Sequence, residues 1–359
     1  MKSLAVFSGV SLLGLSLVLL ACSGGSTPAP VAIAYVAHAQ SHSLSVINIP
    51  ADKTVSRIEI GNSSSSSLAQ AASYPQRVAV TPDGSRVYVT DGSTSVWVVD
   101  TMTNSPIVLI SAGIDPEEVA IAPDGRTAYV TSITCGDLLC SGPSKPAQMA
   151  SVEVIDTATY SLTATITLGN SPEIFLSGIA VSPDGTRVYV TQNTAGTIWV
   201  IDTATNSGAV TISTGSSGLT GVAFSPDGQK LYAVGWTVAN TNFVDVIDTQ
   251  TNAVRTSIAL GNTDRPVGIA ITPDGGHAYV VGAEGHVWVV DTIKNTTVNS
   301  LTVSYPNGLR GVAITPDGTR AYLTCGNKDT IYVLDTASNS VVDRLRSDFP
   351  GGLAISRAR

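Results

Sequence analysis

The chain has 359 residues, of which 43% are hydrophobic and 13% are charged, and its formal net charge is −8. The hydrophobic content is ample for a folded core. The negative charge disfavours nonspecific binding to nucleic acid and to anionic lipid headgroups.

The first 21 residues have the pattern of an export signal. Lys2 is followed by an apolar stretch from Leu4 to Leu20, with small residues before Cys22. The segment ending at Cys22 resembles a bacterial lipoprotein processing site, in which this cysteine becomes the lipid-modified first residue. We therefore predict a signal peptide over residues 1–21, a flexible tether over 22–30, and an exported protein held at a membrane of the bacterial cell envelope. The alternatives are an ordinary secretory signal with a chance cysteine and an uncleaved anchor.

The most regular feature of the remaining chain is a Pro-Asp-Gly tripeptide that occurs six times. The spacings between successive copies are 41, 60, 43, 47 and 43 residues, and the copies begin at Pro82, Pro123, Pro183, Pro226, Pro273 and Pro316. A period of this size, carried by short strands, is typical of the four-stranded blades of a propeller.

Each repeat contains four predicted strands and two rigid turns. In the first complete repeat the strands cover residues 78–80, 87–90, 96–100 and 107–110. Pro-Asp-Gly closes the first hairpin, and an Asp-Thr-x-Thr-Asn turn joins the third strand to the fourth. The strands are apolar at most positions, so both faces of each small sheet must be covered, and neighbouring blades would cover them.

The two ends of the chain supply a further repeat. Residues 34–36, 44–48 and 55–61 match the second, third and fourth strands, and residues 351–356 match the missing first strand. Pairing of these segments would remove the open sheet edges. We therefore predict an all-β fold: a seven-bladed β-propeller of four-stranded antiparallel blades over residues 31–359, closed by its C-terminal strand.

The repeats resemble those of the YVTN family, bacterial and archaeal propellers named for a Tyr-Val-Thr-Asn repeat. The resemblance runs from about Val31 to Arg359 and is clearest at Tyr189–Thr191 and Val200–Asn206. It implies the same propeller fold. The asparagine of the Tyr-Val-Thr-Asn motif is missing from every blade, so a function of the family that depends on this asparagine cannot be assigned to this chain. The residues at its position are His38, Asp91, Ser132, Gln192, Gly235, Gly282 and Cys325.

The strand order predicts two unlike faces. The two kinds of uniform turn share one face, which we call the rigid face. The loops after the second and fourth strands share the opposite, variable face, and they differ from blade to blade. Binding residues collect on loops held by a rigid scaffold, so we predict that the variable face binds a protein or another envelope ligand through Tyr74, Phe175, Trp236 and the 132–150 loop. The alternative is that these loops vary without function.

Charged residues lie where the chain leads into the first strands of the blades. The basic ones are Arg77, Arg265 and Arg310, which we assign to the binding face as a charged funnel at the pore; the alternative is ordinary surface pairing. The acidic ones are Glu117, Glu118 and Glu173. Some propellers with similar repeats are lactonases or lyases, and an enzyme of that type would use these carboxylates. The sequence shows no nucleophile–base pair and no phosphate loop, so we favour a binding module without a cofactor over an enzyme.

Cysteines and histidines raise two further hypotheses. Cys135 and Cys140 lie five residues apart in one predicted loop, and export favours a disulfide between them. Two unpaired thiols, or a bridge from one of them to Cys325, are the alternatives. A weak metal candidate combines the loop residues His38, His42, His286 and Cys325, although no tight ligand spacing supports it. Otherwise these four are expected to be exposed loop residues.

Tryptophans occupy one third-strand position in three repeats, as Trp97, Trp199 and Trp288. The repeat phase predicts that they pack between blades and do not stack on sugars. Because Ser45, Glu153 and Asp245 take this position elsewhere, we expect it to be only partly buried.

Overall fold

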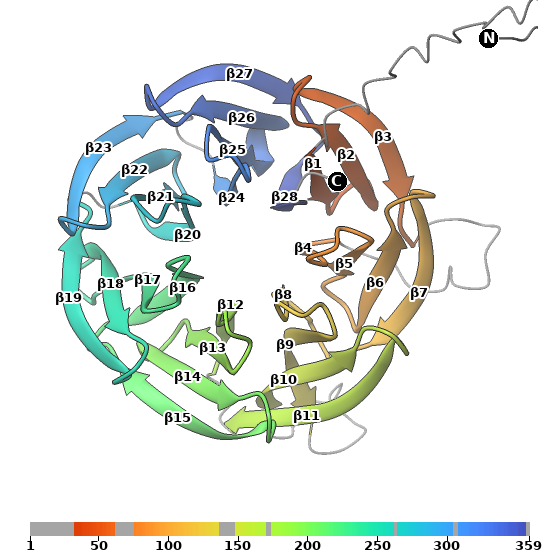
Figure 1. Cartoon of the computed structure of the whole chain (residues 1–359), viewed down its shortest axis with the longest axis horizontal. Coiled ribbons are helices and arrows are strands. Elements are labelled where there is room, and N and C mark those ends of the chain that lie inside the picture. The colour runs from red at the N-terminus through yellow and green to blue at the C-terminus, as the bar shows by residue number, and fades with distance from the viewer. Residues whose placement is uncertain are drawn as a thin grey trace, which may run out of the picture. The chain divides into compact units, whose positions relative to one another are not determined.

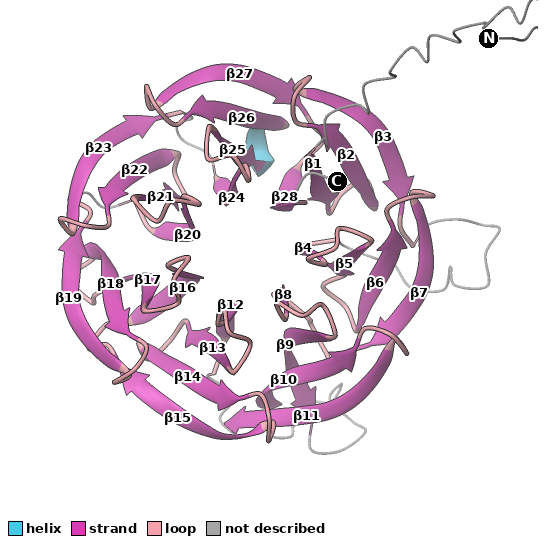
Figure 2. Cartoon of the chain, in the orientation of Figure 1, coloured by secondary structure: helices cyan, strands magenta, loops and turns pink. Residues whose placement is uncertain are grey.

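The computed structural model describes residues 32–61, 75–135, 148–169, 174–261, 264–303 and 308–356. Within these ranges the chain is almost entirely β-strand, with a single 3₁₀ turn at Gly326–Lys328 (Figure 2). Seven four-stranded antiparallel sheets are arranged as blades around a central axis (Figure 1). The predicted seven-bladed propeller is confirmed.

The blades are numbered from the N-terminus, and the first strand given for each is the innermost one of its blade (Figure 1). Blade 1 contains β28 (Pro350–Ile355), β1 (Ile33–His38), β2 (Ser43–Asn48) and β3 (Lys53–Glu59). Blade 2 contains β4 (Val78–Val80), β5 (Arg86–Thr90), β6 (Ser95–Asp100) and β7 (Ser105–Ser111). Blade 3 contains β8 (Val119–Ile121), β9 (Thr127–Cys135), β10 (Gln148–Asp156) and β11 (Ser161–Gly169). Blade 4 contains β12 (Leu176–Val181), β13 (Arg187–Gln192), β14 (Thr197–Asp202) and β15 (Ser207–Ser213). Blade 5 contains β16 (Gly218–Phe224), β17 (Lys230–Trp236), β18 (Asn242–Asp248) and β19 (Ala253–Ala259). Blade 6 contains β20 (Pro266–Ile271), β21 (His277–Gly282), β22 (His286–Asp291) and β23 (Thr296–Thr302). Blade 7 contains β24 (Leu309–Ile314), β25 (Arg320–Cys325), β26 (Thr330–Asp335) and β27 (Ser340–Arg346).

The ring is closed by the two ends of the folded chain. Strand β28 pairs antiparallel with β1, with Leu353 opposite Val36 and Ile355 opposite Ala34. The backbone N–H of Ser356 also donates to the carbonyl of Ile33 over 2.8 Å. This pairing satisfies the edge of β1 that would otherwise be open, as the sequence predicted.

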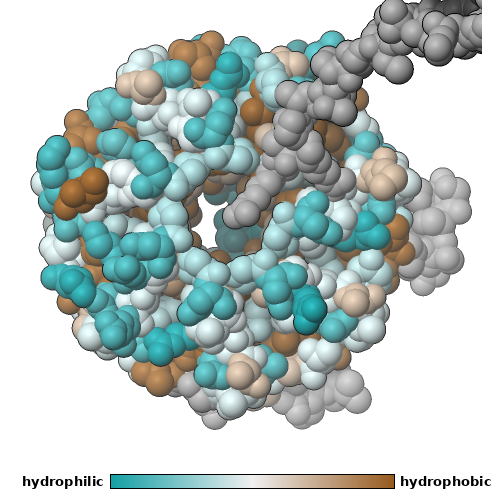
Figure 3. All heavy atoms as spheres, viewed as in Figure 1, coloured by the Kyte–Doolittle hydropathy of each residue, from teal (hydrophilic) through white to brown (hydrophobic). Residues whose placement is uncertain are grey.

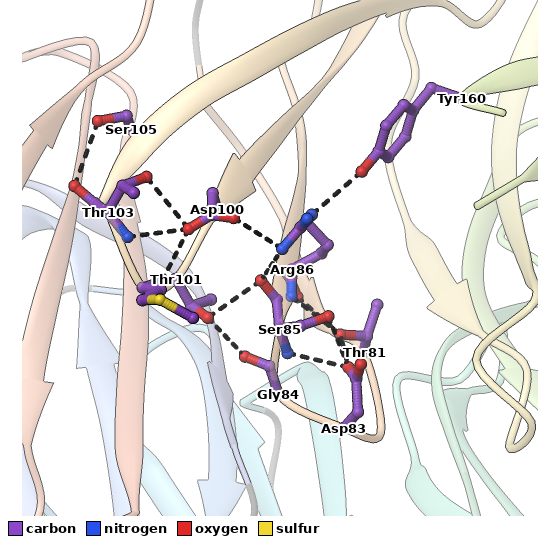
Figure 4. Close-up of polar contacts among 11 residues, drawn as sticks. Thr81, Asp83, Gly84, Ser85, Arg86, Asp100, Thr101, Thr103, Ser105 and Tyr160 are labelled. Atoms are coloured by element: carbon purple, nitrogen blue, oxygen red, sulfur yellow. Dashed lines mark hydrogen bonds and ion pairs between the residues drawn. The ribbon is translucent and has the colours of Figure 1, made fainter. Parts of the chain in front are cut away.

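Two kinds of turn build the rigid face. In blade 2, Gly84 adopts a φ of 67°, which glycine accepts without the steric cost of a side chain, and Asp83 accepts the N–H of Ser85 over 2.9 Å. The hydroxyl of Thr101, from the other turn of the blade, donates to the carbonyl of Gly84 over 2.7 Å (Figure 4). The equivalent threonine makes the same bond in the other five complete repeats, as Thr157, Thr203, Thr249, Thr292 and Thr336. The two turns therefore lie together on one face, as predicted.

The Tyr-Val-Thr motif joins one blade to the next. The hydroxyl of Tyr189 donates to the Oδ1 of Asn252 over 2.9 Å, toward the rigid face of the following blade. The hydroxyl of Thr191 donates to the carbonyl of Thr220 over 2.6 Å and accepts the N–H of Gly178 over 2.7 Å. The motif thus fastens neighbouring blades at both ends of the strand.

Blade 3 changes the tyrosine contact. Its outer turn carries Tyr160 where most blades have asparagine, and the Nε of Arg86 donates to the Tyr160 hydroxyl over 3.1 Å (Figure 4). The buried hydroxyl of Tyr88 has no hydrogen-bond partner among the described residues. Burial raises the pKa of Tyr88, so this phenol stays neutral.

The apolar core consists of clusters that lie between adjacent blades. Trp97 and Trp288 are buried in two of these clusters, which confirms the predicted packing role of the tryptophan position. The expectation of partial burial at this position holds for Trp199, which is half-buried. It is wrong for Glu153 and Asp245, which are each only 1% exposed. Hydroxyl groups make this burial possible. Glu153 accepts hydrogen bonds from Ser132, Ser151 and Thr165, and Asp245 accepts one from Ser257.

Two of the predicted variable loops are shorter than expected. Strands β9 and β10 extend through Ser132 and Ala150, which the sequence placed in a loop, and Ser132 pairs with Ser151. In blade 5, Trp236 is the last residue of β17 and pairs with Gly218 of the inner strand. The hairpins of blades 3 and 5 therefore extend beyond the strands that the sequence indicated.

Several predicted features lie outside the described residues. These are the signal peptide, the tether with Cys22, and the residues Tyr74, Cys140 and Glu173; the side chain of Cys135 is likewise not described. Across the described ranges, no helix is long and apolar enough to span a membrane.

Candidate functional site: the channel mouth and the variable face

One position lines the channel in all seven blades. It is glycine in five of them, where inner strands approach one another closely, and it carries a charged side chain in the two adjacent blades 2 and 3. The residues are Arg77, Glu118, Gly178, Gly221, Gly268, Gly311 and Gly352, and they line one cavity of about 140 Å³. An opening at the centre of the ring is visible in Figure 3. At this position of the inner strand the charged pair therefore faces a ring of glycines, and Arg310 lines the same cavity from the neighbouring position.

Arg77 and Glu118 form an ion pair across the boundary of blades 2 and 3. The Nε of Arg77 lies 2.5 Å from the Oε1 of Glu118. The charge of Glu118, the largest of several influences, holds the pKa of Arg77 above its usual value, so the guanidinium remains charged. Both side chains are partly exposed to solvent, so the pair contributes little to stability.

Arg310 reaches the same cavity from blade 7. Its guanidinium lies over the ring of Phe349, 5.1 Å from the ring centroid. Its Nε lies so close to Gly326 that a Cβ atom there would overlap it. Burial and the charge of Arg77 lower the pKa of Arg310. Among the described residues, no carboxylate forms an ion pair with Arg310.

The third predicted arginine lies apart from the channel wall. The guanidinium of Arg265 stacks over the indole of Trp236, 4.9 Å from the ring centroid, and Arg265 does not line the cavity that holds Arg77 and Arg310. Arg265 is exposed on the surface. The structure thus brings together two of the three arginines predicted for the funnel and pairs the third with a predicted aromatic contact.

A small pocket beside the channel holds Glu117. It is lined by Asp115, Glu117, Thr131, Ser132, Phe175 and Leu176. Burial, reinforced by the charges of Asp115 and Glu118, raises the pKa of Glu117 to about 7. Phe175, a predicted contact of the variable face, is 50% exposed at the edge of this pocket.

The candidate metal ligands do not form a metal site. Among the described residues, no group of three or more histidine, cysteine, aspartate or glutamate side chains could hold a metal ion. The expectation that these residues are exposed is wrong for His38, which is 1% exposed, and for Cys325, which is fully buried. The ring nitrogens of His38 bond to the carbonyl of Asp348 and to the hydroxyl of Ser45. His286 bonds through its Nδ1 to Asp264 over 3.0 Å.

The comparisons with known proteins show the fold. No protein-family model matches the sequence, and no curated protein is significantly similar to it. Among solved structures, the chain is similar to a functionally unknown protein from Desulfotomaculum acetoxidans DSM 771, with a TM-score of 0.71, 17% identity, and coverage of 91% of this chain and 99% of that one. It is also similar to the hydrazine synthase of Kuenenia stuttgartiensis, with a TM-score of 0.66, 23% identity, and coverage of 88% and 92%.

A third similar structure is the dihydro-heme d1 dehydrogenase NirN in complex with DHE, with a TM-score of 0.60, 16% identity, and coverage of 90% of this chain and 74% of that one. These similarities support the propeller fold and do not assign a function. Membership of the YVTN family stays a prediction.

Sequence reasoning missed two residues of the mouth. Asp115 and Phe349 belong to the site, yet each lies in an irregular segment whose place in the repeat is hard to assign. Both have positive φ angles, 50° and 44°, which are uncommon for residues other than glycine and mark sharp bends. An alignment of the seven repeats isolates Arg77 and Glu118, which the sequence analysis did name, in a column of glycines, but it does not single out Asp115 or Phe349.

Proposed function

We propose that this protein is a binding propeller whose variable face recognises a protein or another ligand of the cell envelope, and that a lipid on Cys22 holds it at a membrane. The observation that carries the proposal is the contrast between the two faces. On the rigid face, the polar side chains of the turns are used in the same internal hydrogen bonds in blade after blade. The variable face carries aromatic and guanidinium groups that do not repeat.

The non-repeating groups have the chemistry of an interface. Arg265 is stacked on Trp236, Arg310 is stacked on Phe349, and Phe175 is half exposed. Aromatic residues and arginine are enriched at the centres of protein interfaces, where a rigid side chain loses little conformational entropy on binding. Stacking holds both guanidinium groups in place before a partner arrives.

A second candidate function is catalysis at the mouth, and the state of Glu117 favours it. A carboxyl group with a pKa of about 7 is suited to proton transfer at neutral pH. Its neighbour Glu118 is held in an ion pair by Arg77. Burial also raises the pKa of Asp115 in the same pocket, so neither described neighbour is a carboxylate that clearly stays ionised beside the acid. We therefore rank the binding function first.

Site-specific cross-linking tests the binding function. A photoreactive amino acid is placed at Phe175 or at Trp236 in the full chain and, as a matched control, at Met102 or Ile293, which are apolar and 84% and 80% exposed on the rigid face. The proposal predicts a discrete cross-linked product from the variable-face positions alone. Equal products from both faces, or a product from the rigid face alone, would contradict it.

The membrane tether has its own test. Cys22→Ser should release the protein from the membrane fraction of the cell, while the parent chain remains there and carries a lipid on Cys22 that mass spectrometry detects. A parent chain that is soluble in the envelope, or that carries no lipid, would contradict the tether and leave the binding function to be judged by cross-linking.

A further inference from the structure

We infer that the channel mouth binds an oxyanion, a carboxylate or phosphate group carried by the ligand, and that Arg310 and Arg77 are the residues that hold it. The inference rests on the proposed binding function, because it assigns the chemistry of the group that the same face receives. Three features of the mouth carry it.

The first feature is the state of Arg310. This residue lines the channel cavity, and no described carboxylate forms an ion pair with it. Its side chain is held between Phe349 and Gly326. A guanidinium presents a planar fork of N–H donors that matches the two oxygens of a carboxylate or phosphate. Arg310 is therefore a donor that is held in place and lines the channel cavity.

The second feature is the accumulation of like charge. Arg77 lines the same cavity, separated from Arg310 by the inner strand β28 of blade 1, and its charge contributes to lowering the pKa of Arg310. Two guanidinium groups that sense each other across a cavity repel, and an anion between them relieves the repulsion. The sequence as a whole has a net charge of −8, so this pair is a local exception to the acidic character of the protein.

The third feature is the ion pair of Glu118 with Arg77. Because Glu118 accepts the Nε donor of Arg77 over 2.5 Å, its carboxylate already occupies one edge of the guanidinium in the way that an external carboxylate would. An incoming oxyanion meets Arg310 first and then competes with Glu118 for Arg77. Loss of the charge on Glu118 should therefore strengthen anion binding, whereas it would weaken the binding of a cation.

Five glycines make the space for such a ligand. Gly178, Gly221, Gly268, Gly311 and Gly352 line the cavity beside the two charged residues, so at these five positions no side chain competes with the ligand for room. The cavity of about 140 Å³ takes a small acidic group and not a large organic molecule. The oxyanion is thus the inserted end of a larger ligand that lies on the variable face.

Calorimetric titration of the purified full chain with sodium phosphate and, separately, with sodium acetate tests this inference, with sodium chloride at matched ionic strength as the reference. We expect at least one of the two oxyanions to bind. Arg310→Gln should weaken that binding by about tenfold or more, the usual effect of losing a charge-assisted hydrogen bond. Glu118→Gln should strengthen it several-fold. Arg344→Gln is the matched control, because Arg344 is also exposed and is also stacked on an aromatic ring, 5.5 Å from the centroid of Tyr332 on the outer strands. This variant should bind the oxyanion as tightly as the parent chain does.

Three results would overturn the inference: no binding of either oxyanion, weaker binding in Glu118→Gln, or the same loss in Arg344→Gln as in Arg310→Gln. The phosphate and acetate arms distinguish the two sources of the group. If Arg310→Gln does not fold, the increase expected for Glu118→Gln still decides the question. If neither oxyanion binds while cross-linking from Phe175 persists, the oxyanion site is wrong and the binding face is supported. If an oxyanion binds but no cross-linked product forms, the oxyanion site is supported and the binding of a partner by the variable face is contradicted.

Discussion

Replacement of Thr191 by valine tests the joint between blades most sharply. The Thr191 side chain is fully buried, donates to the carbonyl of Thr220 over 2.6 Å and accepts the N–H of Gly178 over 2.7 Å. Valine has nearly the same shape, and blades 5 and 6 already carry Val234 and Val281 at this position. Thr191→Val therefore removes two hydrogen bonds without opening a cavity.

The expected cost follows from the two groups that lose their partner. A buried donor or acceptor left unpaired costs about 1–3 kcal/mol, so with two such groups we expect Thr191→Val to lower the free energy of unfolding by about 2–6 kcal/mol. Urea unfolding followed by tryptophan fluorescence measures this loss. Thr186→Val is the control, because the Thr186 hydroxyl bonds to the exposed turn residue Asp184 over 2.9 Å, and its loss should cost about 0.5 kcal/mol or less. A Thr191→Val protein as stable as the control would refute the joint.

Three further predictions concern the closure and the inner ring. Burial lowers the pKa of His38 to about 4, below its value in the unfolded chain, so the folded state binds fewer protons. The free energy of unfolding should therefore fall by about 3 kcal/mol as the pH drops from 6.5 to 4. In a plot of the urea midpoint against pH, His38→Gln should flatten this part of the curve. A chain that ends at Phe349 lacks β28 and exposes the edge of β1, so light scattering should detect oligomers or aggregates. If the shortened chain is a stable monomer, the ring does not depend on β28 for its closure. A Cβ at Gly178 would overlap the carbonyl of Thr220, so Gly178→Ala should cost about 1–3 kcal/mol in urea unfolding, and an unchanged midpoint would speak against close packing of the inner strands.

The architecture was predictable because its determinants are local. Each Pro-Asp-Gly turn and each Asp-Thr-x-Thr-Asn turn specifies its own geometry, and the repetition of the unit gives the number of blades. The closing pair β28 and β1 was also predictable, since residues 351–356 match an inner strand that residues 34–61 lack.

The burial of polar side chains was not predictable, because it depends on distant parts of the chain. His38 is buried by contacts with Ser45 and with Asp348, 310 residues away. Glu153 is buried because hydroxyl groups on β9, β10 and β11 converge on its carboxylate. Neither arrangement follows from the position of one residue within its own repeat.

The candidate site lies between these cases. The sequence indicated that Arg77 and Arg310 lie near the starts of inner strands, and the ring brings both to one cavity. The sequence did not indicate that Arg265 stacks on Trp236, since that contact depends on the extension of β17 to Trp236, which the sequence placed in a loop. Alternation along a strand sets which side chains face inward, whereas loop geometry sets which of them meet.

The most direct measurement of the central claim, that recognition belongs to the variable face, is the dissociation constant of the cross-linked partner with two double variants of the full chain. Phe175→Ala with Trp236→Ala removes the aromatic groups of the variable face, and Met102→Ala with Ile293→Ala removes exposed apolar groups of the rigid face. We predict that the first pair weakens binding by about tenfold or more and that the second leaves it unchanged. Equal affinity of the two double variants, or a larger loss in the second, would contradict the claim.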